Sequence, residues 1–299
     1  MSDYRSHILN DLNGVEDLFS SAPFIGIRRH RLLTDGDGVT TLAAFHGCPL
    51  SCKYCINPRC KSNDGIWMYL TPAQLYERVK IDDIYFQSTG GGIVFGGGEP
   101  LLYPKFIKQF YNLCEKNNWK ISVETSLNVD TSIVQQLLPI VSEYIVDIKD
   151  INSNIYKSYT GKDNKKVIEN ICYLVENGAG DKVVIRIPSI EGYNKETDVQ
   201  NTMNELQNMR LSRFECINYI VKPKDTKIEN EYKPIGKAIC EVLKQMRLLI
   251  AETNKIEYIP HECHHQGNCL GTCPLCDNEL KLLTEELYAK KAQGFSINL

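Results

Sequence analysis

Short apolar runs alternate along the chain with longer segments in which apolar residues recur every three to four positions. The runs predict buried strands, and the recurring pattern predicts amphipathic helices. The segment 105–117 is typical, because its apolar side chains fall on one helical stripe. Helices are predicted at 71–79, 105–117, 131–138, 165–177, 197–209 and 235–254. Strands are predicted at 40–45, 92–95, 120–124, 144–147, 182–187 and 215–221.

Repeated strand–helix units imply a parallel sheet, and six of them predict an α/β fold built as a partial (βα)6 barrel. The functional site of such a barrel lies at the carboxyl ends of its strands. An amphipathic helix at 6–21 and a strand at 24–33 are expected before it, and a charged helix at 279–291 after it. We therefore predict an N-terminal extension over 1–38, the barrel over 39–255, and a Cys-rich metal-binding module with a C-terminal helix over 256–299.

The bulk composition narrows the class of partner. The 299 residues are 42% hydrophobic and 24% charged, with a formal net charge of −3, so no basic surface for nucleic acid is indicated. No apolar run reaches the length of a membrane span, and no signal-peptide pattern opens the chain. We expect a cytoplasmic protein whose partner is a small molecule, peptide or protein. Twelve cysteines in such a chain indicate metal or redox cofactors more than disulfides.

Three of these cysteines share the loop that follows the strand at 40–45. Cys48, Cys52 and Cys55 are separated by three and two residues. A [4Fe–4S] cluster is normally held by four cysteines, so three would leave one iron free for another ligand. Zinc fits less well, because it takes four ligands and no His, Asp or Glu stands at knuckle spacing. Buried free thiols fit least, since the loop also contains proline and serine.

A second motif brackets the strand at 92–95 with glycines. The sequence from 90 to 100 is GGGIVFGGGEP, and glycine lets a backbone approach a ligand closely. It is not a phosphate loop, because no Gly-Lys-Ser/Thr follows. Together with the cysteine loop, in which Tyr54 precedes the last cysteine, Gly97-Gly98-Glu99-Pro100 resembles the motifs of the radical S-adenosylmethionine (SAM) enzymes.

This resemblance implies a [4Fe–4S] cluster on Cys48, Cys52 and Cys55, with SAM bound to the fourth iron. It implies that reduction of the cluster cleaves SAM to methionine and a 5′-deoxyadenosyl radical. The positions that it assigns to cofactor binding in these two motifs are Tyr54, Gly97, Gly98 and Glu99.

The segment from 69 to 194 is further similar to the glycyl-radical-enzyme activases, the branch that includes the pyruvate formate-lyase activating enzyme. The match comprises STGGG at 88–92, GGGEPLL at 96–102, ET at 124–125, DIK at 147–149, YTG at 159–161, EN at 169–170 and RIP at 186–188. The resemblance implies that Asp147 and Lys149 contact SAM. It also implies a monovalent-cation site on Glu124, Thr125 and Asp147. A flavodoxin- or ferredoxin-like electron donor and a protein or peptide substrate follow from the same resemblance.

A cysteine-rich segment near the C-terminus indicates a second metal site. Residues 261–276 hold four cysteines and three histidines, and free thiols at this density would be reactive. The candidate ligands are Cys263, Cys269, Cys273 and Cys276. A second [4Fe–4S] cluster is favoured over zinc, because two zinc knuckles are normally separated by a longer run. Cys240, inside a predicted helix, is interpreted as a core thiol.

Three hypotheses follow for the activity. The first is an activase that abstracts a hydrogen atom from a backbone glycine of a protein. The second is a radical SAM peptide or protein maturase that uses the C-terminal site as an auxiliary cluster. The added cysteine module favours it, as does the absence from residues 218–224 of the histidine that activases usually carry, whereas the long match through the barrel favours the first. The third is a non-catalytic iron–sulfur or zinc protein, which would not need the residues that resemble SAM contacts.

Overall fold

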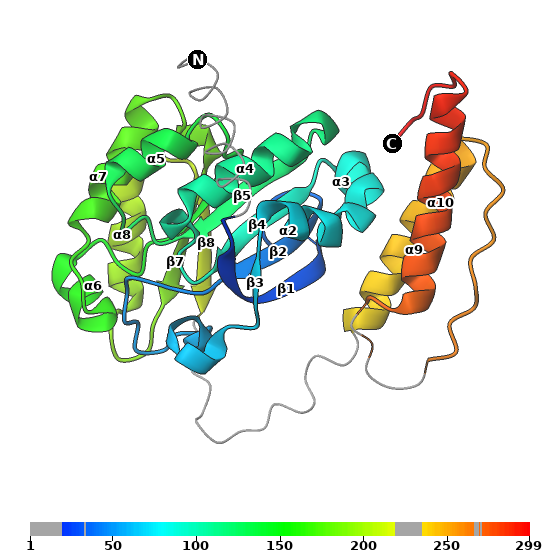
Figure 1. The fold of residues 1–299 in the computed structure, drawn as a ribbon. Coiled ribbons are helices and arrows are strands. Elements are labelled where there is room, and N and C mark those ends of the chain that lie inside the picture. Colours follow the sequence, from blue (N-terminus) through cyan, green and yellow to red (C-terminus); the bar gives the residue numbers. More distant parts are fainter. Residues whose placement is uncertain (1–19, 33, 219–234, 266–268, 270) are drawn as a thin grey trace, which may run out of the picture.

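The computed structural model describes residues 20–32, 34–218, 235–265, 269 and 271–299 (Figure 1). The predicted helix at 6–21 falls almost wholly outside the described residues. The same holds for the histidine-free stretch at 218–224, of which only residue 218 is described.

One eight-stranded sheet forms the centre of the molecule, in the order β3-β1-β2-β4-β5-β6-β7-β8. Six neighbouring strands from β2 to β8 run parallel, which confirms the predicted strand–helix barrel. They are β2 (Val39–Phe45), β4 (Gly92–Gly97), β5 (Lys120–Thr125), β6 (Glu143–Asp147), β7 (Val183–Ser189) and β8 (Arg213–Asn218). Two antiparallel strands, β1 (Ala22–Leu32) and β3 (Met68–Leu70), extend the sheet beyond β2. The carboxyl ends of the six parallel strands therefore lie at one edge.

Helices cover the outer face of the curved sheet, and α9 and α10 lie side by side next to α3 (Figure 1). Their bounds are α2 (Pro72–Val79), α3 (Asp83–Thr89), α4 (Pro104–Cys114), α5 (Thr131–Leu137), α6 (Ser153–Thr160), α7 (Lys165–Glu176), α8 (Glu196–Asn208), α9 (Ile235–Thr253) and α10 (Pro274–Ala292). The sequence did not predict α3 or α6. It also placed the start of α10 five residues too late, because the helix begins with Cys273 as N-cap and proline at its first position.

An aromatic cluster fixes the end of β2, immediately before the cysteine loop. The ring of Phe45 stacks on Phe24 of β1 at 4.4 Å and on Tyr103 at 4.6 Å between ring centroids. Phe95 of β4 stacks on the same ring at 5.5 Å. Stacked aromatic pairs contribute beyond the area that they bury. The cysteine loop therefore leaves a rigid part of the core.

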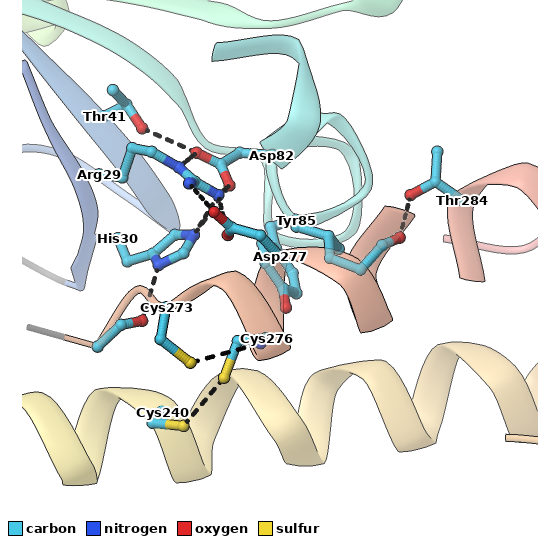
Figure 2. Close-up of polar contacts among 12 residues, drawn as sticks. Arg29, His30, Thr41, Asp82, Tyr85, Cys240, Cys273, Cys276, Asp277 and Thr284 are labelled. Carbon is cyan, nitrogen blue, oxygen red and sulfur yellow. Dashed lines mark hydrogen bonds and ion pairs between the residues drawn. The ribbon is translucent and has the colours of Figure 1, made fainter. Parts of the chain in front are cut away.

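Two largely buried polar networks attach the α9–α10 pair to the rest of the fold, and Figure 2 shows the first of them. In the first, Arg29 of β1 binds Asp82 at 2.7 Å and Asp277 of α10 at 3.0 Å. His30 lies 2.8 Å from the same Asp82 and 3.2 Å from the carbonyl oxygen of Gly271. Burial by itself would raise the pKa of Asp82, but its hydrogen bonds with Arg29 and His30 outweigh that effect and lower it.

The second network centres on Arg247 of α9, whose side chain is 2% exposed. Its guanidinium donates to Glu279 of α10 at 2.8 Å, to Tyr258 at 2.8 Å and to Tyr85 of α3 at 2.7 Å. This buried cation therefore links α9 to α10, to α3 and to the segment between α9 and α10.

The substitution Arg247→Met is expected to lower the free energy of unfolding by about 3 kcal/mol, because it leaves the buried Glu279 carboxylate without its main counter-charge. Urea unfolding under anaerobic conditions measures this loss. The matched control is Lys166→Met, which breaks an ion pair with Asp130 in which the two side chains are 50% and 70% exposed. The control should lose less than about 1 kcal/mol. Equal losses in both variants would contradict a structural role for the Arg247 network.

The boundaries at 38 and 255 stay predictions, although β1 pairs with β2 within one sheet and α9 packs on α10. Among the described helices, none is long and apolar enough to cross a lipid bilayer.

Candidate active site

The cysteine loop is held by backbone hydrogen bonds to two other elements. The amides of Ser51 and Lys53 donate to the carbonyl oxygens of Thr160 and Tyr159, at 2.7 and 3.1 Å. These carbonyls close α6, since the last turn of a helix leaves its carbonyl oxygens free. At the start of the loop, the Gly47 amide donates to the carbonyl oxygen of Cys60 at 2.7 Å. The unpredicted helix α6 therefore helps to set the position of the cysteines.

The glycine motif packs directly on this loop. The Gly98 amide donates to the Phe45 carbonyl at 2.9 Å, and the Glu99 amide donates to the Gly47 carbonyl at 2.7 Å. A Cβ atom on Gly98 would lie 2.0 Å from the Gly47 carbonyl oxygen. Gly97 has φ +88°, and a Cβ there would lie 2.7 Å from that of Ala44. Glycine is thus required because two backbones touch. The approach of this backbone to a ligand stays a prediction.

Glu99 is fully enclosed and joins the ends of β4 and β5. One carboxylate oxygen accepts from the Thr125 hydroxyl at 2.6 Å and the Leu101 amide at 3.2 Å. The other accepts from the Ser126 hydroxyl at 2.6 Å and the Ser126 amide at 2.9 Å. Burial raises the pKa of Glu99, and these hydrogen bonds oppose the rise. The side chain thereby fixes the register of two strand ends beside the cysteines.

A cavity of about 190 Å³ brings most of the predicted site residues together at the carboxyl edge of the parallel strands. The predicted residues that line it are Cys48, Cys52, Cys55, Gly97, Gly98, Glu99, Glu124, Thr125, Asp147 and Lys149. Tyr54 is not among the lining residues. Its ring packs instead against Tyr159 and Tyr193, at 6.2 and 5.8 Å between centroids.

Asp147 and Lys149 meet at the end of β6. Their side chains form an ion pair, and Lys149 has a left-handed backbone with φ +58°. The side-chain amide of Asn194 donates to the Lys149 carbonyl at 3.3 Å and supports this turn. The Oδ1 atom of Asp147 is buried and has no hydrogen-bond partner among the described residues. A buried acceptor without a donor is costly, so this atom suits a ligand that supplies one.

The three loop thiols have different electrostatic surroundings. Burial raises the pKa of Cys48 to about 11, and burial also raises the pKa of Cys52. A hydrogen bond with the Cys60 thiol lowers the pKa of Cys55 to about 6, against the opposing effect of burial. Thiolates are the forms that ligate metals, and ligation itself drives deprotonation. Among the described residues, no three His, Cys, Asp or Glu side chains already surround one metal-ion position.

Arg186 of β7 is the main cavity residue that the sequence left without a defined role. It lies opposite Asp147 in the β6–β7 register and donates to Glu124 at 2.8 Å and to Glu215 at 2.6 Å. Asp35 lies 3.7 Å from the same guanidinium. The inward alternation of β7 was the available signal, since Arg186 falls between Ile185 and Ile187. Ser126, Asn57 and Ile217 also line the cavity and were not predicted.

Glu124 gives this site a pH dependence. Burial raises the pKa of its carboxyl to about 7 from an ordinary 4.5, and the Asp35 carboxylate adds to the rise. Between pH 4.5 and about pH 7, the unfolded chain has released a proton that the folded chain retains. The free energy of unfolding therefore falls as the pH rises through this range. We expect Glu124→Gln to remove this loss. The midpoint of thermal unfolding, measured at pH 5 and pH 8 under anaerobic conditions, should differ less in the variant than in the wild type; an unchanged difference would contradict the assignment.

The C-terminal cysteines lie around a separate cavity of about 160 Å³ between α9 and α10. Cys263, Cys269, Cys273 and Cys276 all line it, and Cys263 is exposed. Cys240 of α9 lines it as well, with its Sγ 3.5 Å from that of Cys276 (Figure 2). The interpretation of Cys240 as a core thiol is therefore wrong, because its helix face meets the cysteine-rich segment.

The chain is similar to known proteins over most of the barrel. The family model described as Radical SAM superfamily matches residues 43–206, more than half of the chain. The pyruvate formate-lyase-activating enzyme of Clostridium pasteurianum is 30% identical over 191 residues, which cover 62% of this chain and 78% of that enzyme. The (2S)-3-sulfopropanediol dehydratase activating enzyme of Klebsiella oxytoca is 30% identical over 235 residues, which cover 58% of this chain and 74% of that enzyme.

Solved structures also align with the chain. The crystal structure of SuiB from Streptococcus suis aligns with a TM-score of 0.46 and 17% identity, over 73% of this chain and 48% of that one. The family match spans the cysteine loop, the glycine motif and the ends of β5 and β6, all of which line the cavity. The chain therefore belongs to the radical SAM superfamily, and its sequence is similar to glycyl-radical-enzyme activating enzymes.

Proposed function

We propose that this chain is an activase, which uses SAM and a [4Fe–4S] cluster to remove a hydrogen atom from a glycine of a protein substrate. One observation carries the proposal. A single cavity joins the three loop cysteines to the ends of β4, β5 and β6, where the residues similar to activase SAM contacts lie. The similarity to activating enzymes supplies the substrate class.

The residues present fit these cofactors. Cys48, Cys52 and Cys55 would hold the cluster, and their count leaves one iron for SAM. The donorless Oδ1 atom of Asp147 fits a ligand that carries amino and hydroxyl groups, as SAM does. The Lys149 ammonium fits its carboxylate. When bound and reduced, the pair supplies a 5′-deoxyadenosyl radical, and the protein positions it and limits competing reactions.

Other parts of the proposal concern the surroundings of the cavity. Glu124, Thr125 and Asp147 are the proposed oxygen ligands of a monovalent cation, which would compete with Arg186 for Glu124. Gly97 and Gly98 would let the SAM methionyl end approach the backbone. Tyr54, which packs outside the cavity wall, would act by supporting the loop. A flavodoxin- or ferredoxin-like protein is the proposed electron donor.

Deuterium transfer tests the proposal. The full chain, reconstituted anaerobically with iron and sulfide and reduced by dithionite, is incubated with SAM and with candidate glycyl-radical enzymes labelled with α-dideuterated glycine. We expect deuterium in 5′-deoxyadenosine, together with the EPR signal of a glycyl radical. An unlabelled enzyme serves as the control.

The outcomes separate the three hypotheses. Cleavage of SAM without deuterium transfer from any of the glycyl-radical enzymes would reject the activase and favour a peptide or protein maturase. Absence of 5′-deoxyadenosine after full reconstitution would reject both and favour the non-catalytic iron–sulfur or zinc protein.

A further inference from the structure

Four cysteines from two distant parts of the chain face one another at the start of α10. Cys240 of α9 lies 3.5 Å from Cys276 between sulfur atoms. Cys273 caps the same helix and accepts a hydrogen bond from the Cys276 amide at 3.5 Å. Cys269 lies in the segment just before, and all four line the cavity between α9 and α10. Figure 2 shows Cys240, Cys273 and Cys276 in this arrangement.

The backbone around these cysteines is arranged to support negative sulfur. The Gly271 amide donates to Cys269 Sγ at 3.3 Å, as the Cys276 amide does to Cys273. Amide donors of this kind stabilise metal-bound thiolates from outside the ligand set. The backbone at Cys269 also packs directly against α9, because a Cβ atom on Gly236 would lie 1.6 Å from the Cys269 carbonyl oxygen. Cys240 lies about one helical turn beyond Gly236.

We propose that Cys240, Cys269, Cys273 and Cys276 form a tetrathiolate zinc site that clamps α9 to α10. The proposal exchanges Cys263 for Cys240 in the ligand set suggested by the sequence, and it replaces iron–sulfur with zinc. Cys263 is the exposed member of the group, whereas the other four are partly buried. The sequence argued against zinc because two zinc knuckles are normally separated by a longer run than residues 263–276 provide. Cys240 lies 33 residues before the Cys273-x2-Cys276 pair, so this argument no longer applies.

The one sulfur–sulfur distance that the described residues give for this cavity fits zinc better than a cluster. Two thiolates on one tetrahedral zinc at Zn–S of about 2.3 Å lie about 3.8 Å apart, close to the Cys240–Cys276 separation. In a cubane each thiolate binds a different iron, so the sulfurs lie further apart. The thiols of the described structure form hydrogen-bonded pairs rather than surrounding one point. Each cysteine has a single side-chain torsion, so closing the site requires rotations about Cα–Cβ bonds.

The position of the site indicates a structural role. Arg29 and His30, which contact Asp277 and Gly271 beside the cysteines, lie on β1 between its pairings Arg28↔Leu42 and Arg31↔Thr40. This is the amino end of β2, and the cysteine loop leaves its carboxyl end. About 13 Å of strand separates Thr41 from Phe45. The site thus lies at the opposite edge of the sheet from Cys48, Cys52 and Cys55, where it would hold the start of α10 against β1.

Charged groups around the cavity fit this assignment. Four thiolates and one Zn²⁺ carry a net charge of about −2. Lys237 and Lys244 line the cavity and supply positive charge beside the carboxylate of Glu241. Of its acidic residues, Glu279 is already paired with Arg247 at 2.8 Å and with His261 at 3.0 Å.

Metal content tests the proposal, independently of SAM cleavage. The full chain is purified anaerobically without added metal, and zinc, iron and sulfide are measured for the wild type, Cys240→Ser and Cys263→Ser. We expect about one zinc ion per chain in the wild type and in Cys263→Ser. We expect less than about a tenth of that in Cys240→Ser. Zinc-edge X-ray absorption of the wild type should show about four sulfur ligands at about 2.3 Å.

A further variant separates ligand loss from misfolding. Cys240→His keeps a zinc-binding side chain, so it should retain zinc with about three sulfur ligands and one nitrogen ligand. Zinc that persists in Cys240→Ser, or is lost in Cys263→Ser, would overturn the ligand set. Iron and sulfide that remain when Cys48, Cys52 and Cys55 are all replaced would overturn the assignment to zinc.

Discussion

Replacing Cys48, Cys52 and Cys55 together with serine is expected to remove the iron and sulfide of the chain and lower 5′-deoxyadenosine formation at least about 100-fold. The reason is that these thiols line the cavity and are its only cysteines among the described residues. Loss of a supporting contact alone costs up to about 100-fold in metal affinity, so loss of all three ligands should exceed that. Iron and sulfide analysis, EPR of the reduced protein and product quantification measure the effect.

The matched control is Cys216→Ser, at an exposed cysteine on β8. It should keep the iron content and SAM cleavage of the wild type. If the triple variant forms 5′-deoxyadenosine at the control rate, the cavity is not the site of SAM cleavage. The zinc content of the triple variant is expected to equal that of the wild type. Unchanged zinc would distinguish loss of the cluster from unfolding of the whole protein.

Replacing Gly98 with alanine is expected to lower SAM cleavage at least about 100-fold, because a displacement of about 1 Å in a catalytic geometry has an effect of that size. The added Cβ would stand 2.0 Å from the Gly47 carbonyl oxygen, so the cysteine loop must move away from the end of β4. Overpacking of this kind also lowers the free energy of unfolding by about 1–3 kcal/mol. SAM affinity by anaerobic titration and urea unfolding measure the two effects.

Gly26→Ala provides the comparison, because a Cβ there meets no atom within 4 Å and neither glycine has a left-handed backbone. The comparison variant should keep its activity, and its stability should change by less than about 1 kcal/mol. Equal activity in the two variants would show that the contact between loop and glycine motif does not position the cluster.

The sequence predicted the parallel strands and most of the cavity for one physical reason. Buried parallel strands are continuous apolar runs, and the residues that follow them meet at one edge, so Glu124, Asp147 and Lys149 could be placed together. The helices α3 and α6 were not predicted because both are short and consist almost entirely of aromatic, β-branched, Ser, Asn and Asp residues, which have low helix propensity. Such short segments are stabilised by contacts distant in sequence, as with Tyr156 and Tyr159 of α6, which are buried in the core.

The role of Cys240 could not be predicted from spacing. It lies 29 residues before Cys269, and its helix shows an ordinary amphipathic pattern. Only the packing of α9 on α10 brings the two segments together. The sequence placed Arg186 in the RIP match at 186–188 but did not assign it a defined role. Its partners Glu124, Glu215 and Asp35 come from three other segments, so a local pattern could not reveal them. The roles of Cys240 and Arg186 therefore depend on contacts between distant segments and not on local sequence patterns.

The α9–α10 pair also closes an otherwise open edge of the sheet. β3 pairs with β1 only at Ala22, Pro23 and Phe24, so the rest of β1 has no strand partner on that side among the described residues. Unpaired strand edges recruit other chains, and proteins protect them with bulges or by covering them. Here a bulge between Arg28 and Arg31 and the docked start of α10 do so. A chain truncated before α9 would therefore expose the unpaired edge of β1 and aggregate, whether or not it still binds SAM.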